Sequence, residues 1–498
     1  MSRIAPETQP SLLPDDDQLR GAELRKSLAT VTAAWVFGSV WLTAVSGAPL
    51  TLFARKLGST ELQLGILTAL PFLAQLTSMP ASVLIERTAQ RKRIFLIGLY
   101  SQRFLWFAIA TIPILLSAGG TTSLGLATGV FLVLTFLMHS GQAVGGTAWV
   151  SWMADVVPDR LRGRYFSRRR QLGILSAIPT ALFVGWILDR VGGGQGETQR
   201  TLFWCAMIFC IAAVFGIADI AMFHLVREPR REPAERVRFA SLFREPLRDR
   251  QFMVFAGFVG TMMFAVSFMG QFVTLYMIER LKITATAVQM MLLVAPMLAQ
   301  FVTLHLWGNA VDRMGKRPVL AIAGLGLVPV GIGWIFVSPE SPWLGYVLSA
   351  AGAALWAGVE TANFNFVLEF SGSDESEAGE RRGSNYVAVN AVIVNAAGCL
   401  GGFSAGVVAW TLRDWRWDHG LPWLNTITFY EVLFLVSAGL RLASVAVFLP
   451  FVHEPRARRT HETLLFMTAN FYNNLMSAAA TPLRLIRQLK AAGFSDRP

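Results

Sequence analysis

The sequence predicts an all-α integral membrane protein with twelve transmembrane helices, arranged as two pseudo-symmetric six-helix bundles. Hydrophobic residues make up 53% of the 498 residues and charged residues only 15%, whereas a soluble domain carries about 25% charged residues. Apolar runs of about 20 residues, long enough to span a bilayer, recur along the chain. The segment 71–75 (Pro-Phe-Leu-Ala-Gln) also recurs 225 residues later as 296–300 (Pro-Met-Leu-Ala-Gln). This repeat indicates two related membrane halves.

The apolar runs divide the chain into elements in a regular order. The twelve predicted spans are 28–53, 62–85, 94–117, 123–150, 170–189, 201–226, 252–278, 286–311, 318–337, 343–369, 385–412 and 424–451. They define an N-terminal bundle (28–226) and a C-terminal bundle (252–451), joined by a charged linker (227–251) with three prolines. The polar segment 1–27 precedes the first bundle. In 452–498, apolar residues at near-helical spacing predict an amphipathic helix along the inner leaflet, and a tail without such a role is the alternative.

Positive charge is distributed unevenly between the two ends of the predicted spans. Segments on one side, counted together with Arg170 at the edge of the fifth span, contain 34 of the 44 Lys and Arg residues, and segments on the other side contain eight. Because positively charged loops stay in the cytoplasm, both tails and the linker are predicted to be cytoplasmic, in the inner membrane of a bacterium. The net charge of +12 therefore reflects topology, and no nucleic-acid partner is expected. Cys205, Cys210 and Cys399 lie in apolar runs without metal-binding spacing, so no metal site is expected.

Four charged motifs lie between predicted spans on the cytoplasmic side. Residues 308–318 read Gly-Asn-Ala-Val-Asp-Arg-Met-Gly-Lys-Arg-Pro after span 8, and the degenerate segment 82–92 follows span 2. A second pair follows span 4 (Asp155, then Arg-Gly-Arg-Tyr-Phe at 162–166) and span 10 (Glu369, then Arg-Gly-Ser-Asn-Tyr at 382–386). In register with the spans, these motifs resemble the loop signatures of the major facilitator superfamily, and the resemblance covers nearly the whole chain.

The resemblance implies that these charged residues form a cytoplasmic gate. A carboxylate at a helix end can bond Arg and backbone groups of a neighbouring helix in one conformation and release them in another. In the family, such clusters lock the cytoplasmic face when the cavity opens outward. The predicted gate residues are Asp155, Arg162, Arg164, Asp312, Arg313, Glu86, Glu369 and Arg382. The alternative is that these residues only fix the topology by keeping positive charge in the cytoplasm.

Span 4 carries a polar stripe at helical spacing that includes His139 and Gln142. Proton-coupled members of the family commonly have Arg-x-x-Gln-Gly here, whereas residues 139–143 read His-Ser-Gly-Gln-Ala. Histidine titrates near neutral pH, so it can carry a proton. Span 10 carries a counterpart stripe with Glu360 and Asn363. An acid within a span is costly and usually faces a cavity or a partner.

By the resemblance, spans 1, 4, 7 and 10 line a central cavity. We therefore predict that His139 and Glu360 face each other and carry coupling protons or contact the substrate. The alternative is that both are satisfied structural side chains. Trp41 in span 1 and Gln271 in span 7 complete the candidate site.

Two opposite charges lie at matching depth in spans 3 and 6. At 1.5 Å per residue, Arg103 lies about 13 Å and Asp219 about 12 Å from the cytoplasmic ends of their spans. These spans are neighbours in the fold that the chain resembles. We therefore predict an ion pair between Arg103 and Asp219 with a mainly structural role.

These observations predict a secondary active transporter that moves a small organic or amphipathic solute by alternating access, coupled to protons. No Gly-x-x-x-x-Gly-Lys-Ser/Thr motif is present, so ATP is not expected to be the direct energy source. No enzyme activity and no cofactor are expected. Membrane lipid, the solute and protons are the expected partners of a monomer. Two alternatives are a lipid or lipid-precursor flippase on the same fold and a non-transporting membrane assembly factor.

Overall fold

The computed structural model describes residues 21–119, 124–191, 197–230, 244–371, 377–418, 426–455 and 457–469. Within these ranges the regular structure is helical, and the only β contact is an isolated bridge between Trp417 and Ile427. Eleven helical segments of this part of the chain are long and apolar enough to cross a membrane. The one predicted span that is not among these eleven, span 10, is also helical (Trp343–Ser371), but Glu360 and Asn363 interrupt its apolar character. The chain is thus an all-α, multi-pass membrane protein, as the sequence predicts.

The first six predicted spans form helices, two of which are broken. Span 1 comprises α1 (Gly21–Val45) and α2 (Ala48–Lys56), and span 2 comprises α3 (Glu61–Gln75) and α4 (Ser78–Thr88). Spans 3 to 6 are α5 (Arg91–Gly119), α6 (Leu124–Val156), α7 (Asp159–Val191) and α8 (Glu197–Met222), the last extended by η3 (Phe223–Leu225). The break after α1 occurs at Gly47, whose φ of 75° suits glycine. Pro49 is the second residue of α2, in the first turn, where its missing N–H is tolerated.

The second six predicted spans contain shorter pieces. Span 7 comprises α10 (Arg250–Ser267), α11 (Phe272–Leu275) and η5 (Tyr276–Arg280), and span 8 comprises α12 (Ala285–Gln289), η6 (Met290–Val294) and α13 (Ala295–Met314). The remaining spans are α14 (Lys316–Gly333) with η7 (Trp334–Phe336), α15 (Trp343–Ser371), α16 (Glu377–Thr411), and α17 (Phe429–Ala443) with η8 (Ser444–Phe448) and η9 (Leu449–Phe451).

Two helices begin well before the apolar runs that predict them. α7 starts at Asp159 rather than at residue 170, and α16 starts at Glu377 rather than at residue 385. Their first turns are rich in Arg or Glu, which are good helix formers in water. An apolar run marks where a helix enters the membrane, so it does not mark where the helix begins.

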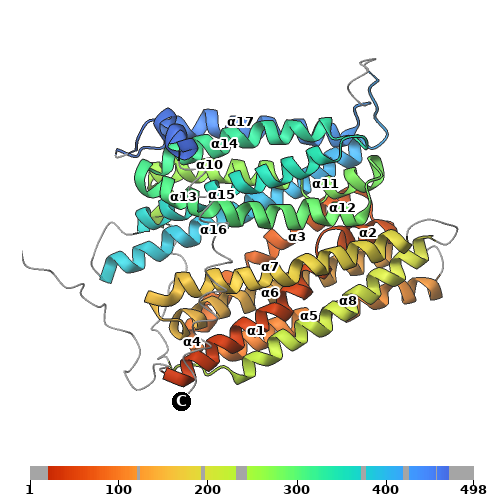
Figure 1. Ribbon diagram of the computed structural model, residues 1–498, viewed down its shortest axis with the longest axis horizontal. Helices are drawn as coiled ribbons and strands as arrows, with labels where there is room; N and C mark the ends of the chain where they lie inside the picture. The colour runs from red at the N-terminus through yellow and green to blue at the C-terminus, as the bar shows by residue number, and fades with distance from the viewer. Residues whose placement is uncertain are drawn as a thin grey trace, which may run out of the picture. The chain divides into compact units, whose positions relative to one another are not determined.

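By contacts, the chain forms two compact units. Unit 1 comprises Met1–Ser46, Ala74–Thr180 and Phe203–Val237, and unit 2 comprises Gly47–Leu73, Ala181–Leu202 and Arg238–Pro498. Figure 1 shows α5 alongside α6 in unit 1, and α14 between α15 and α17 in unit 2. Unit 2 therefore contains the C-terminal predicted bundle together with two segments of the N-terminal one.

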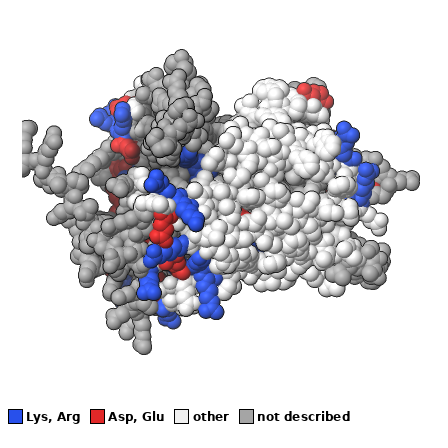
Figure 2. Space-filling model, turned by 60° about the horizontal axis from the view of Figure 1, so that its bottom comes forward, with Lys and Arg blue, Asp and Glu red and all other residues white. Residues whose placement is uncertain are grey.

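Each unit has an apolar core of its own. In unit 1, Phe95 packs between Trp152 and Phe223, with ring centroids 5.7 and 4.7 Å away. In unit 2, Phe255 packs on Phe366, with ring centroids 4.9 Å apart. Over the described part of the face in Figure 2, charged side chains gather at the left and right, and the surface between them is almost entirely uncharged. This banding suits helices that cross a hydrocarbon layer.

The described start of the C-terminal tail is helical over residues 460–469. Its Met467 is buried in the core of unit 2, whereas Leu464 and Leu465 are exposed. Residues 1–20 and 470–498 lie outside the described part of the chain, as does 231–243 of the predicted linker.

Candidate functional site

A charged cluster joins three segments at the basic end of unit 1. Arg91, the first residue of α5, forms an ion pair with Asp155 near the end of α6. Its Nε lies 3.6 Å from Glu228, which follows η3, and its Nη2 donates to the Pro229 carbonyl at 2.7 Å. Only 1% of the Arg91 side chain is exposed. A buried guanidinium of this kind needs both acids to offset its desolvation.

The same arrangement recurs in unit 2. Lys316, the first residue of α14, pairs with Glu369 at the end of α15 and with Glu454 after η9, at 3.2 Å from the latter. Glu454 also accepts hydrogen bonds from the backbone N–H groups of Lys316 (3.0 Å) and Arg317 (2.7 Å). In unit 1 the backbone N–H of Lys92 donates to Glu228 at 3.0 Å. Each glutamate thus supplies negative charge at the positive end of a helix.

These two clusters, called the charge triads below, give a meaning to a second sequence repeat. Val-Arg-Glu-Pro at 226–229 echoes Val-His-Glu-Pro at 452–455. The repeated glutamates Glu228 and Glu454 lie 226 residues apart, and the repeated cations Arg91 and Lys316 lie 225 residues apart. None of these four residues is in the predicted gate. The conserved offset between the halves is the signal that could have found them.

The predicted gate residues are only partly brought together. Asp155 and Glu369 belong to the triads, but the cation bound to Asp155 is Arg91 rather than Arg162. Because α7 begins at Asp159, Arg162 is already helical, and its Nη2 donates to the Ala154 carbonyl at 2.8 Å. The side chains of Arg164 and Arg382 lie outside the described residues.

The remaining gate candidates are exposed. Asp312 and Glu86 form no ion pair or hydrogen bond with any residue that the structure describes. Arg313 lies over the Phe466 ring, with its guanidinium 5.8 Å from the ring centroid. Within the most complete motif, Asp312 and Arg313 are therefore little engaged in this conformation, whereas Lys316 belongs to a charge triad. The gating role of Asp312 and Arg313 stays a prediction.

Inside the predicted membrane region, unit 1 brings Arg103 and Asp219 together. The Arg103 Nη2 lies 3.4 Å from the Asp219 carboxylate, and both side chains are buried. The Arg103 guanidinium also stacks on Trp41, 3.4 Å from the ring centroid. Trp41 is only 6% exposed, so it packs inside the unit. A Cβ at Gly38 would lie 2.7 Å from the carboxylate, which shows how closely α1 approaches this pair.

A chain of polar side chains connects this ion pair to the stripe on α6. Arg103 donates to Gln102, which is 1% exposed, and the Gln102 Nε2 donates to Gln142 at 3.2 Å. Gln142 is exposed, and His139 lies half-buried within hydrogen-bonding reach of it. The sequence treats the ion pair and the stripe as separate features, whereas the structure joins them through Gln102. This series is called the polar relay below.

Arg169 on α7 lies close to the same region and is absent from the predicted site. Its guanidinium is 4.2 Å from the Trp35 ring centroid and 4.9 Å from that of Trp149. Each such contact contributes roughly 0.5–2 kcal/mol. Among the described residues Arg169 has no hydrogen-bond partner, and its Nε is buried. Trp149 lies about two helical turns beyond Gln142 on α6, so the helix face that carries the polar stripe also positions a cation.

In unit 2, the predicted residues of span 10 lie on one face of α15. Glu360 is exposed and accepts a hydrogen bond from the Trp356 Nε1 at 2.8 Å. The Asn363 Oδ1 is buried without a partner among the described residues. His139 and Glu360 belong to different units, so their facing arrangement stays a prediction.

Gln271 contacts two other segments of unit 2, the helices α2 and α3. Its Oε1 accepts from Thr51 of α2 at 2.6 Å, and its backbone N–H donates to Thr68 of α3 at 3.3 Å. The chain leaves the helix α10 at Ser267 and turns before α11, which brings Gln271 beside α2 and α3.

This contact, called the outer contact, lies at the helix ends with few basic residues. Arg55 pairs with Glu279 at 2.7 Å, and the Ala48 backbone N–H donates to Gln289 at 3.1 Å. The Asp189 carboxylate accepts from the N–H groups of Ala285 (2.5 Å) and Thr286 (3.1 Å). All these segments belong to unit 2, so the packing explains why 47–73 and 181–202 join it.

Glycines allow the closest approach within the outer contact. Gly65 of α3 and Gly406 of α16 meet backbone to backbone, and a Cβ on Gly406 would lie 2.8 Å from the Gly65 Cα. Small residues permit this kind of helix packing in membranes. The helices α3 and α16 are therefore tightly packed within the outer contact.

Repeated halves, multi-pass helices and intramembrane charges define a class, that of secondary transporters. The sequence matches the model of the Major Facilitator Superfamily over residues 29–417. The chain belongs to this superfamily, whose members are transporters rather than enzymes. A search of curated proteins finds no match.

Solved structures share the fold along most of the chain. The nucleoside transporter NupG matches with a TM-score of 0.58 and 13% identity, over 87% of this chain and 100% of its own. The xylose transporter XylE from E. coli matches with a TM-score of 0.59 and 13% identity, over 87% and 100%. A bacterial homologue of the iron transporter ferroportin matches with 0.58 and 13%, over 87% and 100%. At these identities the likeness concerns the fold alone.

Proposed function

We propose that the chain is a proton-coupled transporter that moves a small organic or amphipathic solute by alternating access. We place it in a bacterial inner membrane as a monomer, with both termini in the cytoplasm. The observation that carries the proposal is the polar relay, which links the exposed Gln142 to the buried pair of Arg103 and Asp219. A pair with only a structural role needs no hydrogen-bonded connection to an exposed side chain. Ionisable groups in membrane spans commonly serve proton pathways.

Glu360 is the second candidate for coupling. It is an exposed carboxylate on an otherwise apolar helix, and its hydrogen-bond donor is the neutral indole of Trp356. An ionised carboxylate without a cation is costly in hydrocarbon, which favours a position facing water or a solute. Asn363 lies three residues further along, and its buried Oδ1, which has no partner among the described residues, could accept from a solute once a conformational change exposes it. Arg169, held between two indoles, offers guanidinium donors for a solute acceptor.

The outer contact supports alternating access. It holds the outer end of unit 2 closed through Arg55, Gln289 and Asp189. Transport then requires these bonds to break when the outer end opens. In that state the exposed Asp312 is available to bond a neighbouring helix end. The charge triads keep the basic helix ends of each unit together.

The test of coupling is uptake into liposomes that contain the purified chain. An imposed pH gradient drives uptake from a panel of metabolites and amphipathic compounds. We expect Glu360→Gln to reduce gradient-driven uptake to the level of empty liposomes, because the amide cannot exchange a proton. Glu340→Gln is the matched control, since Glu340 lies in an exposed turn between η7 and α15. Undiminished gradient-driven uptake by Glu360→Gln would remove Glu360 from the mechanism.

A further inference from the structure

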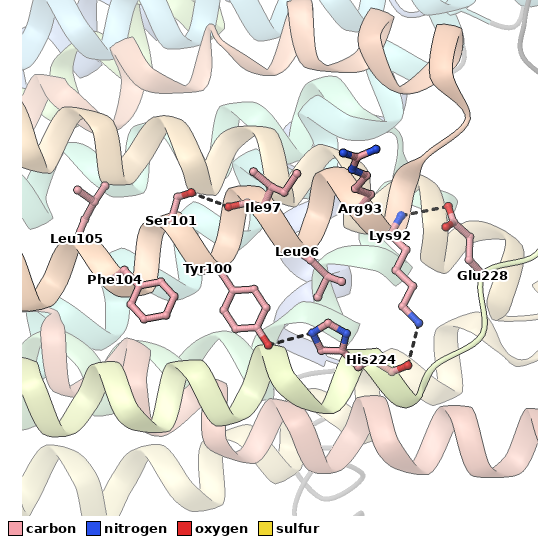
Figure 3. A pocket seen from close by; sticks show the side chains of 10 residues that line it. All are labelled: Lys92, Arg93, Leu96, Ile97, Tyr100, Ser101, Phe104, Leu105, His224 and Glu228. Atoms are coloured by element: carbon pink, nitrogen blue, oxygen red, sulfur yellow. Dashed lines mark hydrogen bonds between the residues drawn. The ribbon is translucent and has the colours of Figure 1, made fainter.

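A groove of about 950 Å³ lies on the surface of unit 1 beside the first turns of α5. Figure 3 shows Lys92 and Arg93 at one end of it and Phe104 and Leu105 at the other. Along its floor, Tyr100 shares a hydrogen bond of 3.2 Å with the His224 Nε2. A cationic end, a tyrosine and an apolar wall follow one another along the helix. This order matches the order of headgroup, interface and hydrocarbon in a bilayer leaflet.

The charge at the end of the groove is not neutralised by the acid beside it. Glu228 is already engaged by Arg91 and by the Lys92 backbone N–H. The Lys92 ammonium donates to the carbonyls of His224 (2.9 Å) and Val226 (2.7 Å), which are neutral acceptors. Arg93 is exposed, and its hydrogen bond goes to the neutral amide of Gln90. Among the described residues, Arg93 is therefore a cation of the groove without a carboxylate partner, whereas Lys92 interacts electrostatically with Glu228.

The apolar wall of the groove is exposed. Ile97 and Phe104 are 59% and 57% exposed, and both line the groove. Exposed apolar side chains directly below a cationic rim form the surface that a phospholipid acyl chain covers in a membrane. Snorkelling basic side chains at this depth also suit a phosphate group.

A second groove of about 510 Å³ occupies the equivalent place in unit 2. Arg317, Ala321 and Glu454 line it at the positions that correspond to Lys92, Leu96 and Glu228 by the sequence repeat. The Arg317 guanidinium donates to the carbonyls of Leu449 and Pro450, at 3.3 Å each. In unit 1, the Lys92 ammonium likewise donates to backbone carbonyls at the end of the sixth span, those of His224 and Val226.

The second groove also has a cationic rim. Arg458 and Arg459 line it and are exposed. Val445 and Leu449 supply its apolar wall. The same combination of charge and apolar surface therefore arises twice, on two separate units.

We propose that each groove is a binding site for an anionic phospholipid of the leaflet at the basic ends of the helices. The headgroup phosphate binds at Arg93 in unit 1 and at Arg458 and Arg459 in unit 2. One acyl chain lies along the apolar wall. Basic pockets between transmembrane helices at the cytoplasmic side favour anionic lipids. The inference concerns lipid binding alone, so it stands or falls independently of proton coupling.

Native mass spectrometry of the full-length protein tests this proposal. The protein is purified in detergent and mixed with phosphatidylglycerol or with phosphatidylcholine of the same acyl chains. We expect two phosphatidylglycerol molecules to be retained, with a preference of about fivefold per cationic side chain. Arg93→Gln should remove one of them, and the double change Arg458→Gln with Arg459→Gln should remove the other.

Two further variants separate specific binding from general charge. Leu96→Trp fills the first groove without changing the charge, and it should also remove one lipid. Arg416→Gln removes an exposed cation at the opposite helix ends and should retain both lipids. Equal retention of the two lipid types, or equal loss in Arg93→Gln and Arg416→Gln, would overturn the proposal. A dimer without lipid adducts would assign the grooves to a second copy and overturn it as well.

Discussion

The triad of unit 2 allows the same chemical change to be compared at two carboxylates that share one lysine. Glu454 and Glu369 both pair with Lys316, but 7% of the Glu454 side chain is exposed against 60% for Glu369. Glu454 also accepts from two backbone N–H groups at the start of α14. We expect Glu454→Gln to destabilise the protein far more than Glu369→Gln does.

The magnitudes follow from these contacts. A helix-capping side chain contributes about 0.5–2 kcal/mol, and a hydrogen bond to a charged group contributes about 1.5–3 kcal/mol. Loss of the Glu454 charge should therefore cost about 2–5 kcal/mol. An exposed ion pair contributes about 0–1 kcal/mol, which is the expected cost for Glu369→Gln.

Thermal unfolding of the purified variants in one detergent measures the difference. The apparent Tm should fall by roughly 5–10 °C in Glu454→Gln and by at most about 3 °C in Glu369→Gln. As a control, both variants should bind the same amount of detergent and have the same helical content by circular dichroism at low temperature. Equal shifts in Tm would refute the reasoning, because burial and helix capping would then make no difference at this lysine.

Three further predictions concern the ion pair of unit 1, a glycine in the outer contact and a control glycine on α17. Asp219→Asn leaves Arg103 buried without its carboxylate, so it should cost about 3–5 kcal/mol, seen as a lower apparent Tm; an unchanged Tm would show that the pair is not holding α5 to α8. Gly406→Val should prevent the approach to Gly65 and leave the outer contact open, which labelling of a cysteine introduced at Thr51 would detect as faster modification than in the parent. Gly439→Ala has nothing within 4 Å of the added Cβ, so it should leave both labelling and Tm unchanged, and a fall in Tm would contradict the packing described for α17.

The helices were predictable because each needs a long apolar run, and a run of this kind has few other uses. The pairing of Arg103 with Asp219 followed from their matching depth and from the adjacency of spans 3 and 6 in the family that the chain resembles, since two opposite charges at one level of a bilayer stabilise each other. The partner of Asp155 was not predictable in this way. Arg91 lies 64 residues from Asp155 along the chain and Arg162 lies much closer, yet the packing of α5 on α6 brings Arg91 to the carboxylate, while Arg162 donates to the Ala154 carbonyl.

Residues outside familiar motifs were missed for related reasons. Gln102 looks like an ordinary polar residue in the sequence, and only its neighbours Arg103 and Gln142 make it part of a relay. The position of Gln271 in span 7 predicts that it lines the cavity, but in the structure the turn after α10 places it in the outer contact. The repeat of Glu228 and Glu454 was visible, yet its meaning depended on which helix each glutamate caps.

Solute-induced proton movement tests the central proposal most directly. Liposomes containing the wild-type chain and a lumenal pH dye receive a transported solute without any imposed gradient. Coupled transport predicts a change in lumenal pH that follows solute uptake and is absent in Glu360→Gln but present in Glu340→Gln. Solute uptake by the wild-type chain with no change in lumenal pH would contradict proton coupling.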